Sequence, residues 1–190
     1  MQKKRIGLLV LVMVFVLSAC TSTKNDTTHN SSTDVTSDIN KKDKLVYTLE
    51  YDHHQYQFNM LDGWRKFPNS DKSIAFLLGN KDSKSFMSAG FEEKGNKTLE
   101  DYKTDYLKKL SDANATVVIE PEKKELNGWD AYYLGVEMKD NKNRVLTYRI
   151  YLIDTPDYFI NLGAWTSEEN PKEATIQGLD DILSTFKEKE

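Results

Sequence analysis

Three consecutive segments in the C-terminal half of the chain constrain its fold most: residues 129–138, 144–153 and 158–165. All three are rich in aromatic and aliphatic residues, and the connections between them, 139–143 and 154–157, are short and polar. Short connections join antiparallel neighbours, and alternation of apolar and polar side chains is the period of a half-buried strand. The segments therefore predict a three-stranded antiparallel meander. The alternation is clearest in the middle segment, at Leu146, Tyr148, Ile150 and Leu152.

Other segments add strands before the meander. Residues 45–51 and 56–60 alternate around a polar turn, which predicts a hairpin. Residues 74–78 are apolar throughout, so we expect a central strand that is covered on both faces. Residues 86–91 and 115–120 are also predicted strands.

The period changes to that of a helix in residues 98–113. Thr98 is the expected N-cap, and Asp101 completes a weaker form of the capping box three residues later. Apolar side chains three and four residues apart form one face. They are Leu99, Tyr102, Tyr106, Leu107 and Leu110.

A second helix is predicted near the end of the chain. Asn170 is the expected cap, Pro171 the first helical residue and Glu173 the partner in a capping box. Its buried stripe would consist of Leu179, Ile182, Leu183 and Phe186. The fold class is therefore α+β: a central, mostly antiparallel sheet of about six to eight strands, with helices packed on its faces.

The N-terminal residues have the pattern of a secretory signal peptide. A basic start is followed by residues 6–17, which are twelve apolar residues and too few to span a bilayer. Residues 17–20 resemble the lipobox of bacterial lipoproteins, which implies cleavage between Ala19 and Cys20 and acylation of the Cys20 thiol. The alternatives are a retained membrane anchor, or a chance cysteine in an ordinary signal peptide.

The polar stretch that follows is predicted to be a tether. Residues 20–42 contain few apolar side chains, so they cannot bury enough surface to offset the entropy of ordering. The predicted organisation is a signal peptide (1–19), a lipid-anchored tether (20–42) and one globular domain (43–190). We expect attachment to the extracytoplasmic face of the cell membrane, and the tether favours a Gram-positive-type surface over an outer membrane.

Charge limits the partners of the domain. The chain has a formal net charge of −4, and removal of the basic leader would make it more negative. Nucleic-acid binding is therefore not expected, and the sequence has no dense basic cluster. Attachment to the membrane is expected through the lipid on Cys20 alone.

The order of elements resembles the PsbP/DcrB-like families over about residues 45–187. The similarity rests on residues 58–64 (FNMLDGW), 126–131 (LNGWDA) and 184–186 (STF). This resemblance implies an antiparallel sheet between helices. It also implies a role in binding partners or as an accessory subunit, because members of these families share no single catalytic apparatus.

Motifs of catalysis and metal binding are not found in the sequence. His29 lies in the tether, and His53 and His54 are adjacent residues expected to be exposed in a turn, so no metal site or cofactor is expected. Ser88 lacks the Gly-x-Ser-x-Gly context of a nucleophile elbow, and no catalytic residue is assigned. Acids such as Asp101, Asp105 and Asp180 are expected on solvated helix faces.

Trp64, Trp129 and Trp165 each lie at a predicted strand end or turn. They could form an aromatic platform that contacts a sugar or a peptide, or they could pack beneath the helices. Replacing each with alanine would separate the two cases.

The leading hypothesis is a surface-tethered binding or accessory module without catalytic activity, contacting an envelope protein or polymer. One alternative is an extracytoplasmic hydrolase that uses carboxylates, for which we would expect a cleft with two close, partly buried acids. The other is a small-ligand receptor subunit of a transporter.

Overall fold

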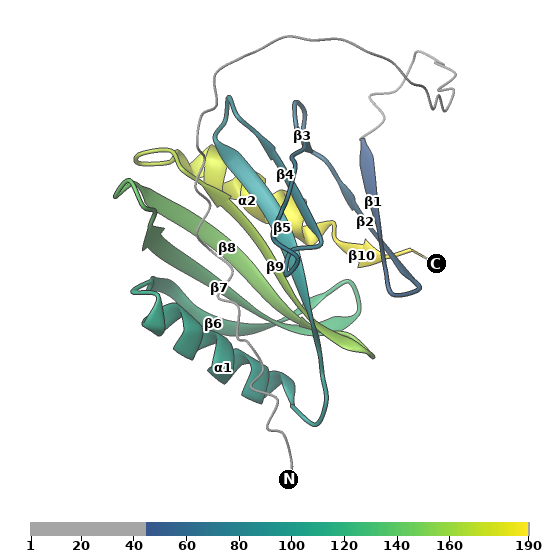
Figure 1. Cartoon of the computed structure of the whole chain (residues 1–190). Helices are drawn as coiled ribbons and strands as arrows, with labels where there is room; N and C mark the ends of the chain where they lie inside the picture. The colour runs from purple at the N-terminus through teal and green to yellow at the C-terminus, as the bar shows by residue number, and fades with distance from the viewer. Residues whose placement is uncertain (1–44, 190) are drawn as a thin grey trace, which may run out of the picture.

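The computed structural model describes residues 45–189 (Figure 1). The predicted signal peptide, the lipid-anchor residue Cys20, the tether 20–42 and His29 lie outside these described residues. Among the described residues, no helix is both long and apolar enough to cross a bilayer.

Seven antiparallel strands form the main sheet, in the order β3-β4-β5-β9-β8-β7-β6. The predicted meander is confirmed as β7, β8 and β9, which are neighbours in this sheet. The strands are β3 (Arg65–Lys66), β4 (Phe76–Asn80), β5 (Ser85–Glu93), β6 (Thr116–Leu126), β7 (Trp129–Lys139), β8 (Val145–Asp154) and β9 (Tyr158–Thr166).

A second sheet contains three strands in the order β1-β2-β10. The predicted hairpin forms β1 (Val46–Tyr51) and β2 (His54–Asn59), and the C-terminal β10 (Lys187–Glu188) pairs with β2. The sequence analysis did not predict β10, because a two-residue strand has no period. Pairing with β2 brings the end of the chain back to its first described elements (Figure 1).

The two helices belong to different cores on the two sides of the main sheet (Figure 1). Helix α1 (Leu99–Asp112) buries Tyr102, Tyr106 and Leu110 against one face. Helix α2 (Glu173–Ser184) packs on the other face, together with the small sheet. The predicted α+β class, with helices on both faces of an antiparallel sheet, is therefore confirmed.

Two local predictions are wrong. The strand near 74–78 is buried at Phe76, Leu77 and Leu78, but it is not central, because only the short β3 lies outside it. Helix α2 begins at Glu173 with Lys172 at the N-cap, and a lysine side chain has no acceptor for a capping hydrogen bond. Asn170 (φ 56°) and Pro171, which were predicted as the cap and the first helical residue, both lie before the helix.

Candidate functional site: an aromatic row beside α1

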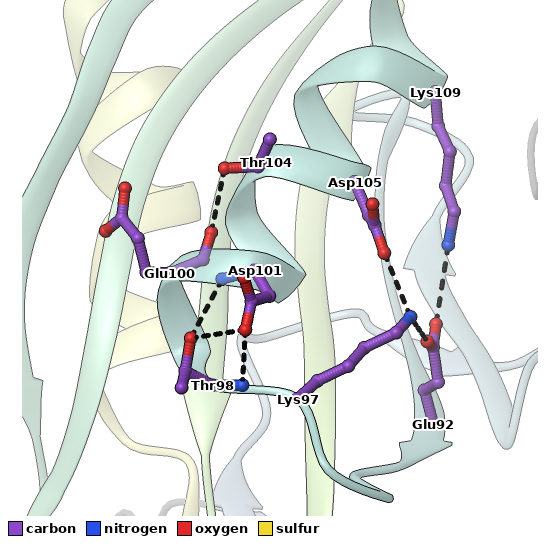
Figure 2. A network of polar contacts seen from close by, with 8 residues as sticks. All are labelled: Glu92, Lys97, Thr98, Glu100, Asp101, Thr104, Asp105 and Lys109. Carbon is purple, nitrogen blue, oxygen red and sulfur yellow. Dashed lines mark hydrogen bonds and ion pairs between the residues drawn. The ribbon is translucent and has the colours of Figure 1, made fainter.

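Helix α1 begins at a capping box that the sequence predicted. The Asp101 N–H donates to Thr98 Oγ1 at 3.1 Å, and the Thr98 N–H donates to Asp101 Oδ2 at 3.0 Å (Figure 2). The Thr98 hydroxyl also donates to Asp101 Oδ2 at 2.7 Å, and the hydrogen bonds from the Thr98 N–H and hydroxyl lower the pKa of Asp101. The cap fixes where the helix starts.

An ionic network then connects α1 to the sheet. Lys97 Nζ lies 2.9 Å from Asp105 Oδ2 and 3.0 Å from Glu92 Oε1, while Lys109 Nζ lies 3.4 Å from Glu92 Oε2 (Figure 2). Hydrogen bonds to Asp105 and Glu92 raise the pKa of Lys97. Glu92 belongs to β5, so the network holds α1 over one part of the sheet. Other side chains lie on the rest of this face.

Beyond α1, four aromatic rings cross the same face of the sheet. We call Phe67, Phe86, Trp165 and Tyr148 the aromatic row. Ring centroids are 5.8 Å apart for Phe67 and Phe86, 5.7 Å for Phe86 and Trp165, and 5.3 Å for Trp165 and Tyr148. Tyr148 is buried beside α1, whereas the other three rings are half-buried. The row therefore runs from the α1 core out to the edge of the sheet.

Strand register produces this row. Phe86 pairs with Trp165, and Trp165 pairs with Tyr148, so the three rings meet on one face of adjacent strands. On the other side of Phe86, Gly79 is its partner in β4. A Cβ at position 79 would lie only 2.5 Å from Phe86 Cδ1, so the ring covers the glycine.

The outer end of the row is basic. Arg65 Cζ and Lys81 Nζ lie 5.6 Å and 5.5 Å from the Phe67 ring centroid, within the range of cation–π attraction. Lys66 and Lys84 are nearby in the chain and exposed. Within residues 45–189, none of these four cations forms an ion pair.

The three tryptophans do not form one platform. Trp64 is only 6% exposed, in the α2-side core. Trp129 is half-buried in the same core, with its ring 6.1 Å from that of Phe186. Trp165 is the member of the set that lies on the α1 side. Packing in the core therefore describes Trp64 best, Trp129 and Trp165 are half-buried on opposite sides of the sheet, and contact with a partner stays a prediction for both.

Sequence reasoning missed Phe67 and Phe86 as neighbours of Trp165. Phe86 was assigned to a strand, but register between distant strands cannot be read from a single sequence. Phe67 lay in a segment without an assigned element. The one available signal was the glycine at 79, since an isolated glycine in a strand indicates close approach by a neighbour.

A cavity of about 230 Å³ lies at the N-terminal end of α1, lined in part by Glu100, Asp130 and Asp154. Two of these acids already have cationic partners: Glu100 pairs with Lys103, and Asp154 with Lys94. Hydrogen bonds from Lys103 and Tyr132 lower the pKa of Glu100. A general acid needs a raised pKa instead, so Glu100 is unsuited to that role at neutral pH.

Asp180 is not on a solvated face as predicted. It is half-buried, because it follows Leu179 and precedes Leu183 by one turn on the sheet-facing side of α2. Tyr133 Oη donates to Asp180 Oδ1 at 2.7 Å, and Arg149 Nε lies 3.8 Å from Oδ2. Burial raises the pKa of Asp180. Through Tyr133 and Arg149, Asp180 connects α2 to β7 and β8.

The histidines also differ from prediction in part. His53 is exposed, as expected, but His54 opens β2 and is half-buried, with Nδ1 2.8 Å from Glu188 Oε1 and Nε2 3.2 Å from Asp157 Oδ2. The hydrogen bond with Glu188 raises the pKa of His54. In the part of the chain that the structure describes, no group of three or more His, Cys, Asp or Glu side chains is arranged so that it could hold a metal ion.

Comparison with known proteins shows the fold. No protein-family model matches the chain, and no curated protein matches it. Cyanobacterial PsbP (CyanoP) from Synechocystis sp. PCC 6803 is 17% identical, with a TM-score of 0.56 over 76% of this chain and 92% of that protein. LpqN of Mycobacterium tuberculosis, described as involved in cell envelope biogenesis, is 12% identical, with a TM-score of 0.53 over 77% of this chain and 91% of that protein.

Proposed function

We propose that this chain is a lipid-anchored binding or accessory module of the cell envelope, and that the aromatic row is the surface that meets its partner. The observation that carries the proposal is the row itself: three half-buried rings on a sheet face that α1 leaves open, ending at cations without acidic partners among the described residues. Aromatic side chains and arginine are enriched where proteins meet their partners.

The location rests on the lipobox-like sequence at 17–20. Acylation of Cys20 would hold the domain at the extracytoplasmic membrane face, with residues 21–42 as a spacer. The structural similarity to LpqN, a protein involved in envelope biogenesis, is compatible with an accessory role in the same compartment.

Catalysis is not part of the proposal. Of the carboxylates found together in the cavity beside α1, Glu100 and Asp154 each have a cation of their own, and the half-buried Asp180 is paired with Arg149. These ion pairs support structural roles for the three acids over the roles of acid and base in a carboxylate hydrolase.

The test is affinity purification of the full chain from crosslinked membranes of its host. We expect a specific component to be recovered with the wild type, lost with the double variant Phe86→Ala/Trp165→Ala, and retained with Val118→Ala, an exposed control on β6. Thermal unfolding is measured first, to check that each variant is still folded at the temperature of the experiment. Failure to recover any specific component with the wild type would sink the proposal.

A further inference from the structure

By its width, α1 covers only part of its face of the main sheet. A helix with its side chains is about 10–12 Å wide, whereas neighbouring strands are about 4.8 Å apart, so one helix covers roughly two strands. The main sheet has seven strands, and α1 is the one helix on this face in the described part of the chain. The aromatic row lies on strands β5, β9 and β8 and reaches the segment after β3.

The rings in the row do not offer their flat faces. Phe86 and Trp165 stack with an interplanar angle of 26°, and Trp165 and Tyr148 with an angle of 25°. Two cations lie over the Phe67 ring. Sugars stack on open ring faces, so a polysaccharide is a poor match. The edges of these rings are instead suited to contact with aliphatic side chains of a partner.

The charge at the outer end of the row indicates which charge the partner carries. Residues 62–84 contain five lysines or arginines against three aspartates, although the whole chain has a net charge of −4. Arg65 and Lys81 are the cations nearest the row. A partner with negative charge beside its apolar surface would therefore be attracted to this end and oriented by it.

We propose that the row is the docking site for an amphipathic helix of a protein partner, with an apolar face at positions i, i+3, i+4 and i+7 and acidic side chains along the flank that meets Arg65 and Lys81. This inference rests on the proposed function and specifies its partner. The partner helix lies beside α1 and completes the helical layer on this face.

The chain's own N-terminal segments match the site poorly. Residues 6–17 are apolar, but their flank carries Lys3, Lys4 and Arg5, which the basic end of the row would repel. Residues 21–42 contain only Val35 and Ile39 as large apolar side chains. Neither segment combines an apolar face with an acidic flank.

Site-specific photocrosslinking in the native host tests this inference. The full chain carries a photoreactive phenylalanine analogue at Phe86. A second site, half-buried Ser88, keeps the Phe86 ring in place, and exposed Val118 is the control site. Crosslinked peptides are mapped by mass spectrometry. We expect adducts from 86 and 88, but not from 118, on a partner segment with helical apolar spacing and acidic residues.

Charge reversal provides the second measurement. Arg65→Glu/Lys81→Glu should lower the yield of the Phe86 adduct at least tenfold, while Lys172→Glu/Lys187→Glu, which changes the net charge equally at exposed positions elsewhere, should leave it unchanged. Melting temperatures of both variants should match that of the wild type.

The outcomes separate the two proposals. The proposed docking helix would be overturned by adducts with a carbohydrate polymer, with residues 1–44 or with a second copy of the chain. The proposal that the row is a binding surface would remain. Equal loss in both charge variants would also overturn it. Absence of adducts at 86 and 88 would overturn both the docking helix and the proposed function.

Discussion

Glycine at position 79 determines whether the aromatic row can form. Phe86 lies over it, with Cδ1 2.5 Å from the place a Cβ would occupy, and the Ser85 carbonyl oxygen is 2.6 Å from the same place. The backbone carbonyl cannot move without breaking strand pairing between β4 and β5. The absence of a Cβ at Gly79 therefore leaves the space that the Phe86 ring occupies.

We expect Gly79→Ala to lower the free energy of unfolding by about 1–3 kcal/mol, the usual cost of overpacking. The matched control is Gly163→Ala, whose added Cβ would meet its nearest atoms at 3.7 and 3.9 Å. That control should be neutral or stabilise by up to about 1 kcal/mol. Urea unfolding of both variants checks the prediction, and equal destabilisation would contradict it.

Alanine substitutions of Trp64 and Trp165 should differ in their cost to stability in the same assay. Trp64→Ala removes a 6% exposed core residue and should cost about 3–5 kcal/mol. Trp165→Ala should cost less than about 2 kcal/mol, because part of its surface is already in water. Thermal and urea unfolding measure both losses. A loss at Trp165 as large as that at Trp64 would mean that Trp165 serves the core and leaves no surface role for it.

At the scale of elements, the two helices are held in place by different means. Helix α1 has a full capping box and the network through Glu92, whereas α2 lacks a side-chain cap and relies on Asp180, Arg149 and packing. The position of α1 matters for the proposed function, because α1 does not cover the aromatic row.

Thr98→Ala should therefore destabilise the protein by about 1 kcal/mol through loss of the cap. Thr104→Ala is the matched control, since its Oγ1 only donates to the Glu100 carbonyl within the helix and alanine is a better helix former. We expect the control to be neutral or slightly stabilising in chemical denaturation. Indistinguishable effects of the two changes would contradict the role of the cap.

The stability of the junction between β2 and β10 should depend on pH through the protonation of His54. Its hydrogen bond with Glu188, together with Asp157 and Asp52 nearby, raises the pKa of His54, so the folded state binds its proton more tightly than the unfolded state does. The stabilisation is therefore complete below the unfolded pKa of about 6.5 and is lost as pH rises through the folded value. Urea unfolding from pH 5.5 to 8.5 should show the advantage of the wild type over His54→Gln shrinking with pH. A gap that is constant or grows with pH would refute this.

At the scale of the whole molecule, period and turn chemistry predicted the α+β class, the meander and the capped α1 helix, because these depend on neighbours in sequence. The separate three-stranded sheet, the burial of Asp180 and the contacts of Trp165 depend on pairings between segments far apart in the chain. Phe58 and Phe186, for example, meet in one core with ring centroids 6.1 Å apart. A local pattern holds no information about such contacts.

The central claim is that the aromatic row is covered by a partner in the envelope. Hydroxyl-radical footprinting of the full chain, in native membranes and after purification, measures this directly, with Trp129 on the other core as the internal reference. The account predicts that Trp165 and Phe86 are oxidised several-fold less in membranes than in the purified protein, while Trp129 is unchanged. Equal oxidation of Trp165 in both samples would contradict it.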